Sequence, residues 1–536
     1  MKAHFKSMYK SLKYFFEFSE REGQKYWWSQ IHLIALTGLL IRVIVVFVSD
    51  NIYHPDEIFQ YLEQAHRLKF GYGIIPWEYR YGIRSWILPG FLAGILHILH
   101  NIGIDEPKFY IPIIRSFFCF SSLSLIYSAY IITRSIASEN AGRLASLLTC
   151  FWYELIYFAS KPTPEVLSAY SLSLAVACIC VKPNRRNALL FGFLSALSIV
   201  LRLQYLPVIL PLMVIGTLRL GRTNFLTTSI AFLIPIVVAG YIDYLTWGGF
   251  LGSYYNNYIY NSIYKVSEIF GTSPHNYYVK SLMISSGGIF VFATFGCLMT
   301  SNFSKIWLPL LCIVSIVLPH SLIAHKEHRF IFASTSFLII LTTIFISDFI
   351  AKLGLTRKLR SLVEYLFIAA ILIFCLSAFG FTSRLPSYQT LIPYKDRIYH
   401  VSLLARHPML SAYLFLHEEP SLVAILNQYS IWWMTGGYYY LHRNVPIYYP
   451  DHLEGISIEN YSSYISHIIC RKSDDLIPGF APVFELGNLE IRKAIKTPSH
   501  NNLIDIDTIN IPQLGVDDVF QPTVKVPSRL KNNSEY

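Results

Sequence analysis

The chain has 536 residues, of which 53% are hydrophobic and only 14% are charged. A soluble globular protein carries about 25% charged residues, so this composition excludes a soluble multidomain enzyme, a disordered chain and a coiled coil. The formal net charge is +11, but the Lys and Arg residues are not pooled in one basic stripe, which argues against nucleic-acid binding. They stand between apolar runs, as in a membrane protein with many spans.

The first hydrophobic run, 31–48, follows a basic N-terminal segment, 1–30. The apolar core of a cleavable signal peptide is shorter and ends at a small-residue cleavage site. We therefore expect an uncleaved first membrane span, with the N-terminal segment in the cytoplasm. Arg42 lies inside this run and must face protein or water rather than lipid.

Ten further apolar runs predict membrane helices, since a span needs about 20 residues. Several runs are short, which predicts tilted or broken helices around Arg202, Pro207 and Pro211. The sequence thus predicts a polytopic α-helical membrane protein with about eleven spans. The ten runs are 112–132, 144–160, 165–181, 188–201, 203–218, 225–246, 279–300, 306–323, 330–349 and 363–381.

The charges between the runs predict their orientation. Short basic links such as Lys182–Arg186 and Lys352–Arg360 separate the runs into pairs. Because positive residues favour the cytoplasmic side, each pair of spans must begin and end on that side. The first loop, 50–111, then stays outside the cytoplasm, and its apolar run Trp86–Leu99 is a re-entrant or surface-lying helix.

The chain changes character from about residue 384. Its charges are mixed, Pro is frequent, and strand-like pieces such as Ser421–Leu426 and Val483–Ile491 alternate with turns. We expect a catalytic membrane domain over 31–383, a small mixed α/β domain on the non-cytoplasmic side over 384–500, and a loose tail over 501–536.

Carboxylates gather on the predicted outer side. Asp56 and Glu57 directly follow the first span, where two adjacent acids are costly to hold. A carboxylate can deprotonate a hydroxyl, so a catalytic pair is favoured over a solvated loop start. In the next outer loop Glu165 begins a helix, where an ordinary N-terminal helix charge is the alternative. Candidate substrate-binding residues of the first loop are His54, Trp77, Glu78 and Arg84.

Cations gather on the same side. Arg202 interrupts an apolar stretch and is a candidate partner for an anion. The loop after 306–323 contains His325, Lys326 and Arg329, a basic patch that suits a lipid phosphate, and Glu327 can orient it. His325 and His328 lack a third ligand for zinc, so we expect no metal. The Tyr-rich loop 247–278, with His275, suits a sugar, although Tyr also populates membrane interfaces by default.

At these residues the sequence resembles glycosyltransferase family 22, a mannosyltransferase family with the GT-C fold. The resemblance runs from about residue 31 to 381. Within the family, the motifs are closest to the branch that adds the third mannose of GPI anchors through an α-1,2 linkage. The motifs are His54–Glu57 with Phe59-Gln60, Trp77-Glu78, Gly82–Ser85, Gly271–Pro274 and His325–Phe330.

The resemblance implies an inverting transfer of mannose from dolichyl-phosphate mannose, in the lumen of the endoplasmic reticulum, to a glycan or glycolipid. It places the catalytic base within the pair Asp56 and Glu57, and Lys326 and Arg329 on the donor phosphate. Enzymes of this fold that use lipid-phosphate donors generally need no bound metal, so we expect no cofactor. We also expect a monomer.

Three alternatives stay open at this stage. A bacterial relative would use a polyprenyl-phosphate donor with another sugar or another acceptor, on the periplasmic face of the inner membrane. A transporter of lipid-linked sugars would place ionisable residues near the midplane of discontinuous helices. A structural subunit without chemistry would leave the acidic pair dispensable.

Overall fold

The computed structural model of the chain describes residues 25–50, 52–354, 356–378, 390–394, 397–401, 406–453, 455–499 and 503. The predicted N-terminal segment up to residue 24, the predicted boundary at 384 and nearly all of the predicted tail lie outside these residues. The chain forms two compact units. The helical unit comprises 1–45, 115–241 and 265–403, and the mixed unit comprises 46–114, 242–264 and 404–536.

Each of the eleven apolar runs coincides with one helix or with two consecutive helices. These are α2 (Lys25–Val48), α6 (Pro107–Ser121), α7 (Leu123–Ile136), α8 (Glu139–Phe151), α9 (Tyr153–Phe158), α10 (Pro164–Ile179), α11 (Arg185–Leu201), α12 (Leu206–Leu220), α13 (Phe225–Trp247), α16 (Tyr277–Ser285), α17 (Ile289–Thr300), α18 (Phe303–Leu322), α19 (Phe332–Lys352) and α20 (Arg357–Ala378).

By length and composition, six stretches of described helix can cross a membrane. They are Gln30–Val48, Pro107–Ile136, Leu203–Leu220, Arg222–Trp247, Phe303–Leu322 and His328–Lys352. The helices Pro164–Ile179 and Leu366–Ser377 are apolar but shorter than the roughly 20 residues of a straight span. The total of eleven crossings therefore stays a prediction.

One run that we expected to form a single span, 279–300, is broken. Helices α16 and α17 meet there at an angle of 105°. Gly287 and Gly288 stand at the break with φ angles of +58° and +85°, which residues with a side chain rarely adopt. The predicted break at Arg202 is confirmed, because α11 ends there and a short 3-10 helix, Leu203–Tyr205, precedes α12. The chain does not break at the two prolines: Pro207 lies in the first turn of α12, where a missing N–H costs nothing, and α12 continues through Pro211.

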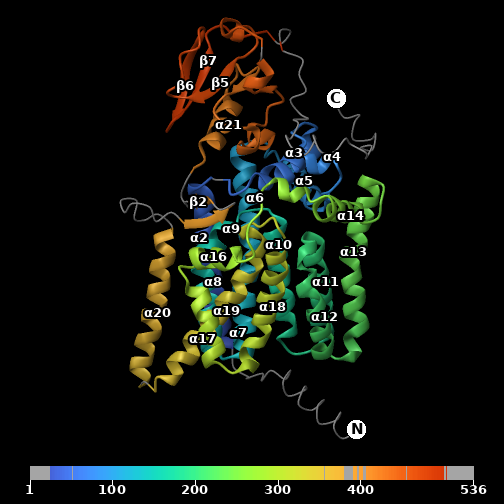
Figure 1. The fold of residues 1–536 in the computed structure, drawn as a ribbon, viewed down its shortest axis with the longest axis vertical. Coiled ribbons are helices and arrows are strands. Elements are labelled where there is room, and N and C mark those ends of the chain that lie inside the picture. Colours follow the sequence, from blue (N-terminus) through green and yellow to red (C-terminus); the bar gives the residue numbers. More distant parts are fainter. Residues whose placement is uncertain are drawn as a thin grey trace. The chain divides into compact units, whose positions relative to one another are not determined.

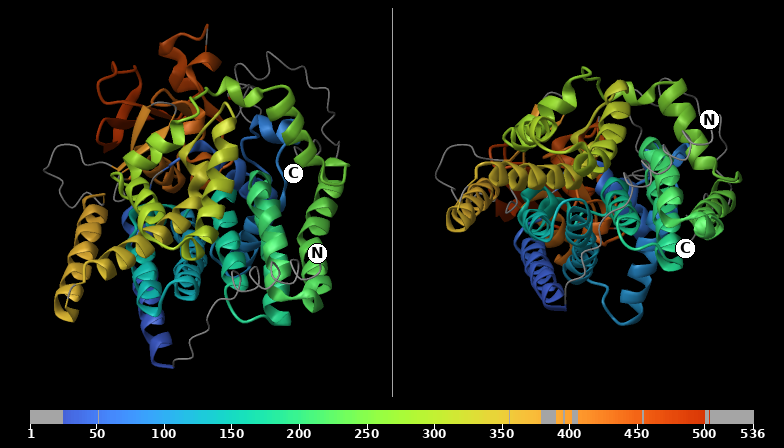
Figure 2. Two further views of the ribbon diagram at one scale, coloured as in Figure 1. Left: turned by 60° about the horizontal axis from the view of Figure 1, so that its bottom comes forward. Right: turned by 90° about the horizontal axis from the view of Figure 1, so that it is seen from below.

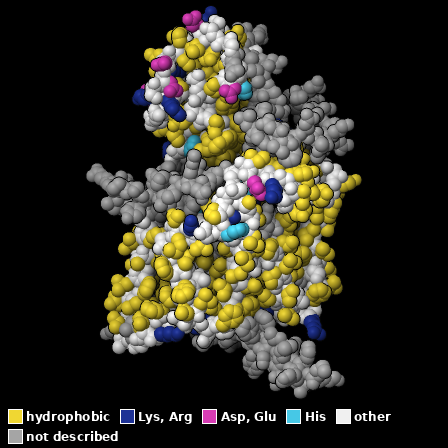
Figure 3. All heavy atoms as spheres, in the orientation of Figure 1, with side chains coloured by type: hydrophobic (Ala, Val, Ile, Leu, Met, Phe, Trp, Pro, Cys, Tyr) yellow, Lys and Arg dark blue, Asp and Glu magenta, His cyan; other side chains and the backbone are white. Residues whose placement is uncertain are grey.

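Helix α19 lies at the centre of the helical unit. It packs against α7, α8, α10, α17 and α18 (Figure 1), and most of its side chains are buried. Figure 2 shows this bundle from two further directions. Hydrophobic side chains cover the face of the helical unit drawn in Figure 3, as lipid-facing helices require.

Arg42 is buried inside α2, as predicted, and faces protein. Its guanidinium donates to the carbonyl oxygens of Gly38 at 2.9 Å, Cys150 at 3.1 Å and Thr149 at 3.2 Å. The last two carbonyls lie at the C-terminal end of α8, where Trp152 leaves the helical conformation. Arg42 therefore caps the broken end of a neighbouring helix and satisfies groups that lipid cannot.

The mixed unit combines short helices with a five-stranded sheet of order β4-β3-β5-β7-β6, in which β3 is parallel to β4 and β5 and the other pairs are antiparallel. Its strands are β3 (Ile425–Asn427), β4 (Ile447–Tyr448), β5 (His467–Arg471), β6 (Phe480–Leu486) and β7 (Leu489–Ala494), and its helices include α3 (Glu63–Phe70), α4 (Trp77–Arg80), α5 (Ile87–Asn101), α14 (Gly252–Tyr258), α21 (Pro408–Glu418) and α22 (Gly437–Leu441). A separate hairpin of β1 (Thr390–Tyr394) and β2 (Arg397–Val401) belongs to the helical unit.

The mixed α/β character of the C-terminal part is confirmed, with two corrections to its strands. The expected strand Val483–Ile491 is a hairpin, because Gly487 turns the chain between β6 and β7 with a φ of +61°. In the expected strand Ser421–Leu426, only Ile425 and Leu426 are in β3. The apolar run in the first loop forms α5, whose 15 residues are too few for a straight span.

We predict that replacing Arg42 with Met destabilises the protein by about 3 kcal/mol, because buried carbonyl groups without a donor cost roughly 1–3 kcal/mol each. Thermal unfolding in detergent measures the effect. The matched control is Arg185→Met, which removes an exposed guanidinium at the start of α11 and should leave the melting temperature unchanged. Equal melting temperatures for both variants would contradict the capping role.

Candidate functional site

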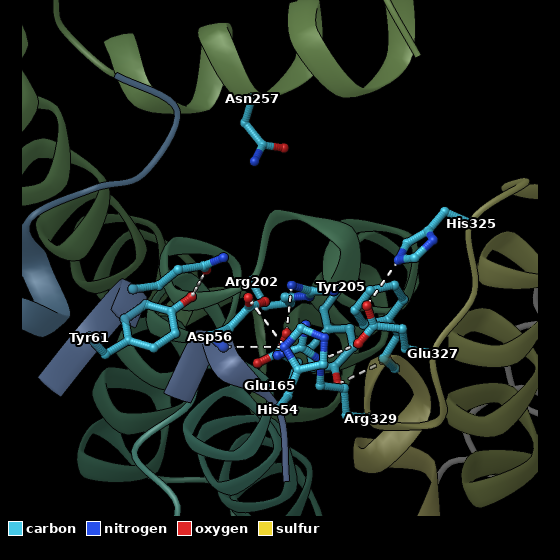
Figure 4. Close-up of polar contacts among 12 residues, drawn as sticks. His54, Asp56, Tyr61, Glu165, Arg202, Tyr205, Asn257, His325, Glu327 and Arg329 are labelled. Carbon is cyan, nitrogen blue, oxygen red and sulfur yellow. Dashed lines mark hydrogen bonds and ion pairs between the residues drawn. The ribbon is translucent and has the colours of Figure 1, made fainter. Parts of the chain in front are cut away.

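The acidic pair of the first loop lies at the start of an unusual helix. Glu57 begins a π-helix, Glu57–Leu62. Such wide helical turns are rare in proteins, and those that occur are often at functional sites. His54 shapes this start: its carbonyl oxygen accepts from the Glu57 backbone N–H at 3.1 Å, and its ring lies 3.2 Å from the Asp56 carboxylate (Figure 4). The Asp56 side chain is 18% exposed, whereas Glu57 is buried.

A third carboxylate, that of Glu78, belongs to the same cluster. The Gln60 side chain, on the π-helix, donates to Glu78 at 2.6 Å. Burial and then the nearby charge of Asp56 raise the pKa of Glu78 to about 7, while Arg84 opposes the shift. The structure thus brings together Asp56, Glu78 and Arg84, which the sequence analysis named separately, and gives Gln60 of the same motif a partner in Glu78.

The Gly82–Ser85 motif of the first loop is held in place by residues that the sequence analysis missed. Asp243 is fully buried. It accepts from Ser85 at 3.0 Å and from the backbone N–H and hydroxyl of Ser253 at 2.9 and 2.6 Å. Trp247 donates to the carbonyl oxygen of Arg84 at 3.0 Å. Trp77, a predicted substrate-binding residue, is buried at the start of α4.

In the helical unit, two guanidinium groups lie against one aromatic ring. Arg202 and Arg329 lie 4.5 Å and 5.5 Å from the ring centre of Phe330. Each has a carboxylate partner: Arg202 meets Glu165 at 2.8 Å, and Arg329 donates to Glu327 at 2.6 Å (Figure 4). All four charged side chains are buried, and a buried charge needs such a partner.

The rest of the basic patch holds the loop together. Lys326 donates to the carbonyl oxygens of Ser273, Ile323 and Ala324 at 2.8, 2.5 and 3.5 Å. His325 faces Glu327 at 2.9 Å and the carbonyl oxygen of Gly271 at 2.8 Å. These contacts fasten the Gly271–Pro274 motif to the His325–Phe330 motif. His275 is exposed and contacts the carbonyl oxygen of Ser321.

His328 belongs to a separate buried cluster. Its ring nitrogens lie 2.8 Å from Glu154 and 2.5 Å from Ser281. Thr335 donates to Glu154 at 3.4 Å. The sequence analysis missed Glu154, although a lone acid inside an apolar run was a usable signal. The two His side chains thus have different carboxylate partners, Glu327 for His325 and Glu154 for His328.

Comparison with known proteins identifies relatives of this chain. Residues 33–442 match the model of the Alg9-like mannosyltransferase family. The chain is 29% identical to GPI mannosyltransferase 3 of Yarrowia lipolytica, over 54% of this chain and 58% of the relative. It is 27% identical to GPI alpha-1,2-mannosyltransferase 3 of Danio rerio, over 61% and 60%. The matches thus span less than two thirds of the length of these relatives.

Solved structures show the same fold. ArnT from Cupriavidus metallidurans matches in the apo state with a TM-score of 0.58, and bound to undecaprenyl phosphate with a TM-score of 0.55. Both matches cover 90% of this chain and 99% of ArnT at 12% identity, so the likeness concerns the fold alone. It confirms the predicted GT-C fold, and the chain is an integral membrane protein.

The raised pKa of Glu78 predicts that the stability of the protein depends on pH. This pKa of about 7 in the folded protein lies above the ordinary 4.5, so proton uptake by this group stabilises the fold as the pH falls from 7 toward 4.5. As the pH falls through that window, the free energy of unfolding of the wild type should therefore rise by about 3 kcal/mol relative to that of Glu78→Gln, since one pKa unit corresponds to about 1.4 kcal/mol.

Melting temperatures of the two proteins in detergent, between pH 8 and pH 5, measure this difference. Glu459→Gln is the control, because Glu459 is exposed on a short helix of the same unit. Parallel curves for wild type and Glu78→Gln would show that the pKa of Glu78 is not raised.

Proposed function

Because this chain belongs to the Alg9-like mannosyltransferase family, we propose that it transfers mannose from a lipid-phosphate donor to a hydroxyl group of a glycan or glycolipid. Relatives named GPI alpha-1,2-mannosyltransferase 3, in fish and mouse, support a GPI precursor as the acceptor and an α-1,2 linkage. ArnT binds undecaprenyl phosphate, which supports a long-chain lipid phosphate as the carrier.

The eukaryotic sources of these relatives favour dolichyl-phosphate mannose as donor, the membrane of the endoplasmic reticulum as location and its lumen as the side of reaction. They do not favour the bacterial alternative or the transporter. The basic links between the apolar runs support the same orientation. The protein would act as a monomer.

The observation that carries the catalytic proposal is the cluster of Asp56, Glu57 and Glu78. In an inverting transfer, the acceptor hydroxyl oxygen bonds to C1 of mannose as the bond from C1 to the phosphate oxygen breaks. A carboxylate takes the hydroxyl proton, and the phosphate leaves on its lipid. We assign the base to Asp56, because its side chain is more exposed than that of Glu57 and a base must reach its proton.

The donor phosphate is assigned to Arg202 and Arg329. Their guanidinium groups flank Phe330 and offer forks of donors that match a phosphate. His325 and Glu327 orient Arg329 from the same loop. The ammonium group of Lys326 donates to three carbonyl oxygens, so its role is to shape the loop.

We predict that Asp56→Asn lowers kcat by about 10²–10⁴, the usual contribution of a general base, without weakening donor binding. Glu57→Gln should have a smaller effect. The assay follows transfer from dolichyl-phosphate mannose to a GPI precursor with two mannoses. Asp105→Asn, an acid on the surface of the same loop, is the control. Near-normal turnover in both acidic-pair variants would refute the catalytic role of the pair.

For Arg329, we expect Arg329→Lys to raise the donor KM about tenfold and to leave the acceptor KM unchanged, because the ammonium keeps the charge but loses the fork. Arg492→Lys is a matched control, since Arg492 is also buried and donates through Nε to a carboxylate two residues earlier, Glu490. A donor KM that rises equally in both variants, or in neither, would exclude Arg329 from the phosphate site.

A further inference from the structure

Glu63 is a fully buried carboxylate that the catalytic proposal does not use. One oxygen accepts from the backbone N–H groups of Ile74 at 2.8 Å and Tyr438 at 3.1 Å, and the other accepts from Tyr439 at 2.9 Å. Three backbone donors therefore converge on one side chain. The two tyrosines follow Gly437, which lies 374 positions along the chain from Glu63.

Gly437 is shaped to admit this carboxylate. Its φ is +58°, and a Cβ atom there would lie 2.5 Å from one oxygen of Glu63 and 2.8 Å from its carboxyl carbon. Glycine is thus required twice, by the backbone conformation and by the space that Glu63 occupies. The C-terminal turn and the carboxylate form one fitted contact.

This contact adjoins the π-helix at whose start the acidic pair lies. Glu63 follows the last residue of the π-helix that Glu57 begins, so fixing Glu63 fixes the end of that helix. Ile74, its third donor, precedes Glu78 by four residues. One turn of α3 further on, His66 meets His442 at 2.9 Å, at the other end of α22. Helix α22 is therefore held by α3 at both of its ends.

We propose that Glu63 is a positioning residue, which uses the Gly437–Tyr439 turn of the C-terminal part to hold Asp56, Glu57 and Glu78 in their catalytic arrangement. The C-terminal part is then a component of the transferase and not an appended domain. This inference rests on the catalytic role proposed for the acidic pair. It predicts that substitutions in the turn, which touch no substrate, slow the chemical step.

The experiment compares kcat, donor KM and acceptor KM for Glu63→Gln, Gly437→Ala and the double variant, each normalised to monodisperse protein. Either single variant should lower kcat about tenfold with both KM values within about twofold of wild type. Because both substitutions break the same contact, the double variant should lose little more than one of them. Glu63→Asp, which retains the charge, should recover part of the activity lost in Glu63→Gln.

Gly487→Ala is the matched control. Gly487 has nearly the same φ, +61°, but a Cβ atom there meets nothing within 4 Å. It carries the same backbone strain without disturbing a carboxylate, and it should leave kcat unchanged. Wild-type kcat in Glu63→Gln and Gly437→Ala, equal losses in Gly437→Ala and Gly487→Ala, or multiplicative losses in the double variant would each overturn the positioning role.

Hydrogen exchange separates this proposal from the proposed function. Backbone amides of residues 57–63 should exchange faster in Gly437→Ala than in wild type or Gly487→Ala, whatever reaction the protein catalyses. If the wild type transfers no mannose, the proposed function fails, and the exchange rates alone decide whether the turn anchors this helix. Unchanged exchange in Gly437→Ala would overturn the anchoring.

Discussion

The pairing of Glu165 with Arg202 at 2.8 Å shows the constraint on which the rest of the structure depends. A lone buried ion costs several kcal/mol, so a predominantly apolar protein can place charge at its site only where each group meets a partner. Glu327 with Arg329 follows the same rule, and Arg42 follows it with carbonyl oxygens. For the donor phosphate proposed above, the partners of Arg202 and Arg329 hold each guanidinium in place in advance, which is the preorganisation that favours catalysis.

The mixed unit solves the same problem with neutral donors. Glu63 meets backbone N–H groups, and Glu78 meets the amide of Gln60. Neutral donors offset less of the lost hydration than a buried guanidinium does. Burial accordingly raises the pKa of both carboxyls to about 7. These groups can therefore change protonation near neutral pH, so the stability of the unit depends on pH.

Three buried acids of the candidate site, Glu154, Asp243 and Glu63, escaped the sequence analysis. Glu154 and Asp243 are single acids inside apolar runs, 144–160 and 225–246. The length of these runs predicts the helices, and the isolated charge in each run also signals a buried partner. No sequence pattern marks Glu63 in this way. Its donors are backbone N–H groups, and such groups do not depend on the type of residue that carries them. The signal at Lys326 was ambiguous, since a cation beside a predicted phosphate site can equally hold its own loop.

By itself the sequence determined the class of protein, the helices and the motifs, because apolar runs and charge between them follow from the cost of placing polar groups in lipid. It also determined which residues of the first loop and of the basic patch to examine. Only the tertiary structure decided that Arg202 belongs with Glu165, that two guanidiniums share Phe330, and that Gly437 receives Glu63. Those contacts join residues far apart in the chain, and local pattern carries no information about which distant groups converge.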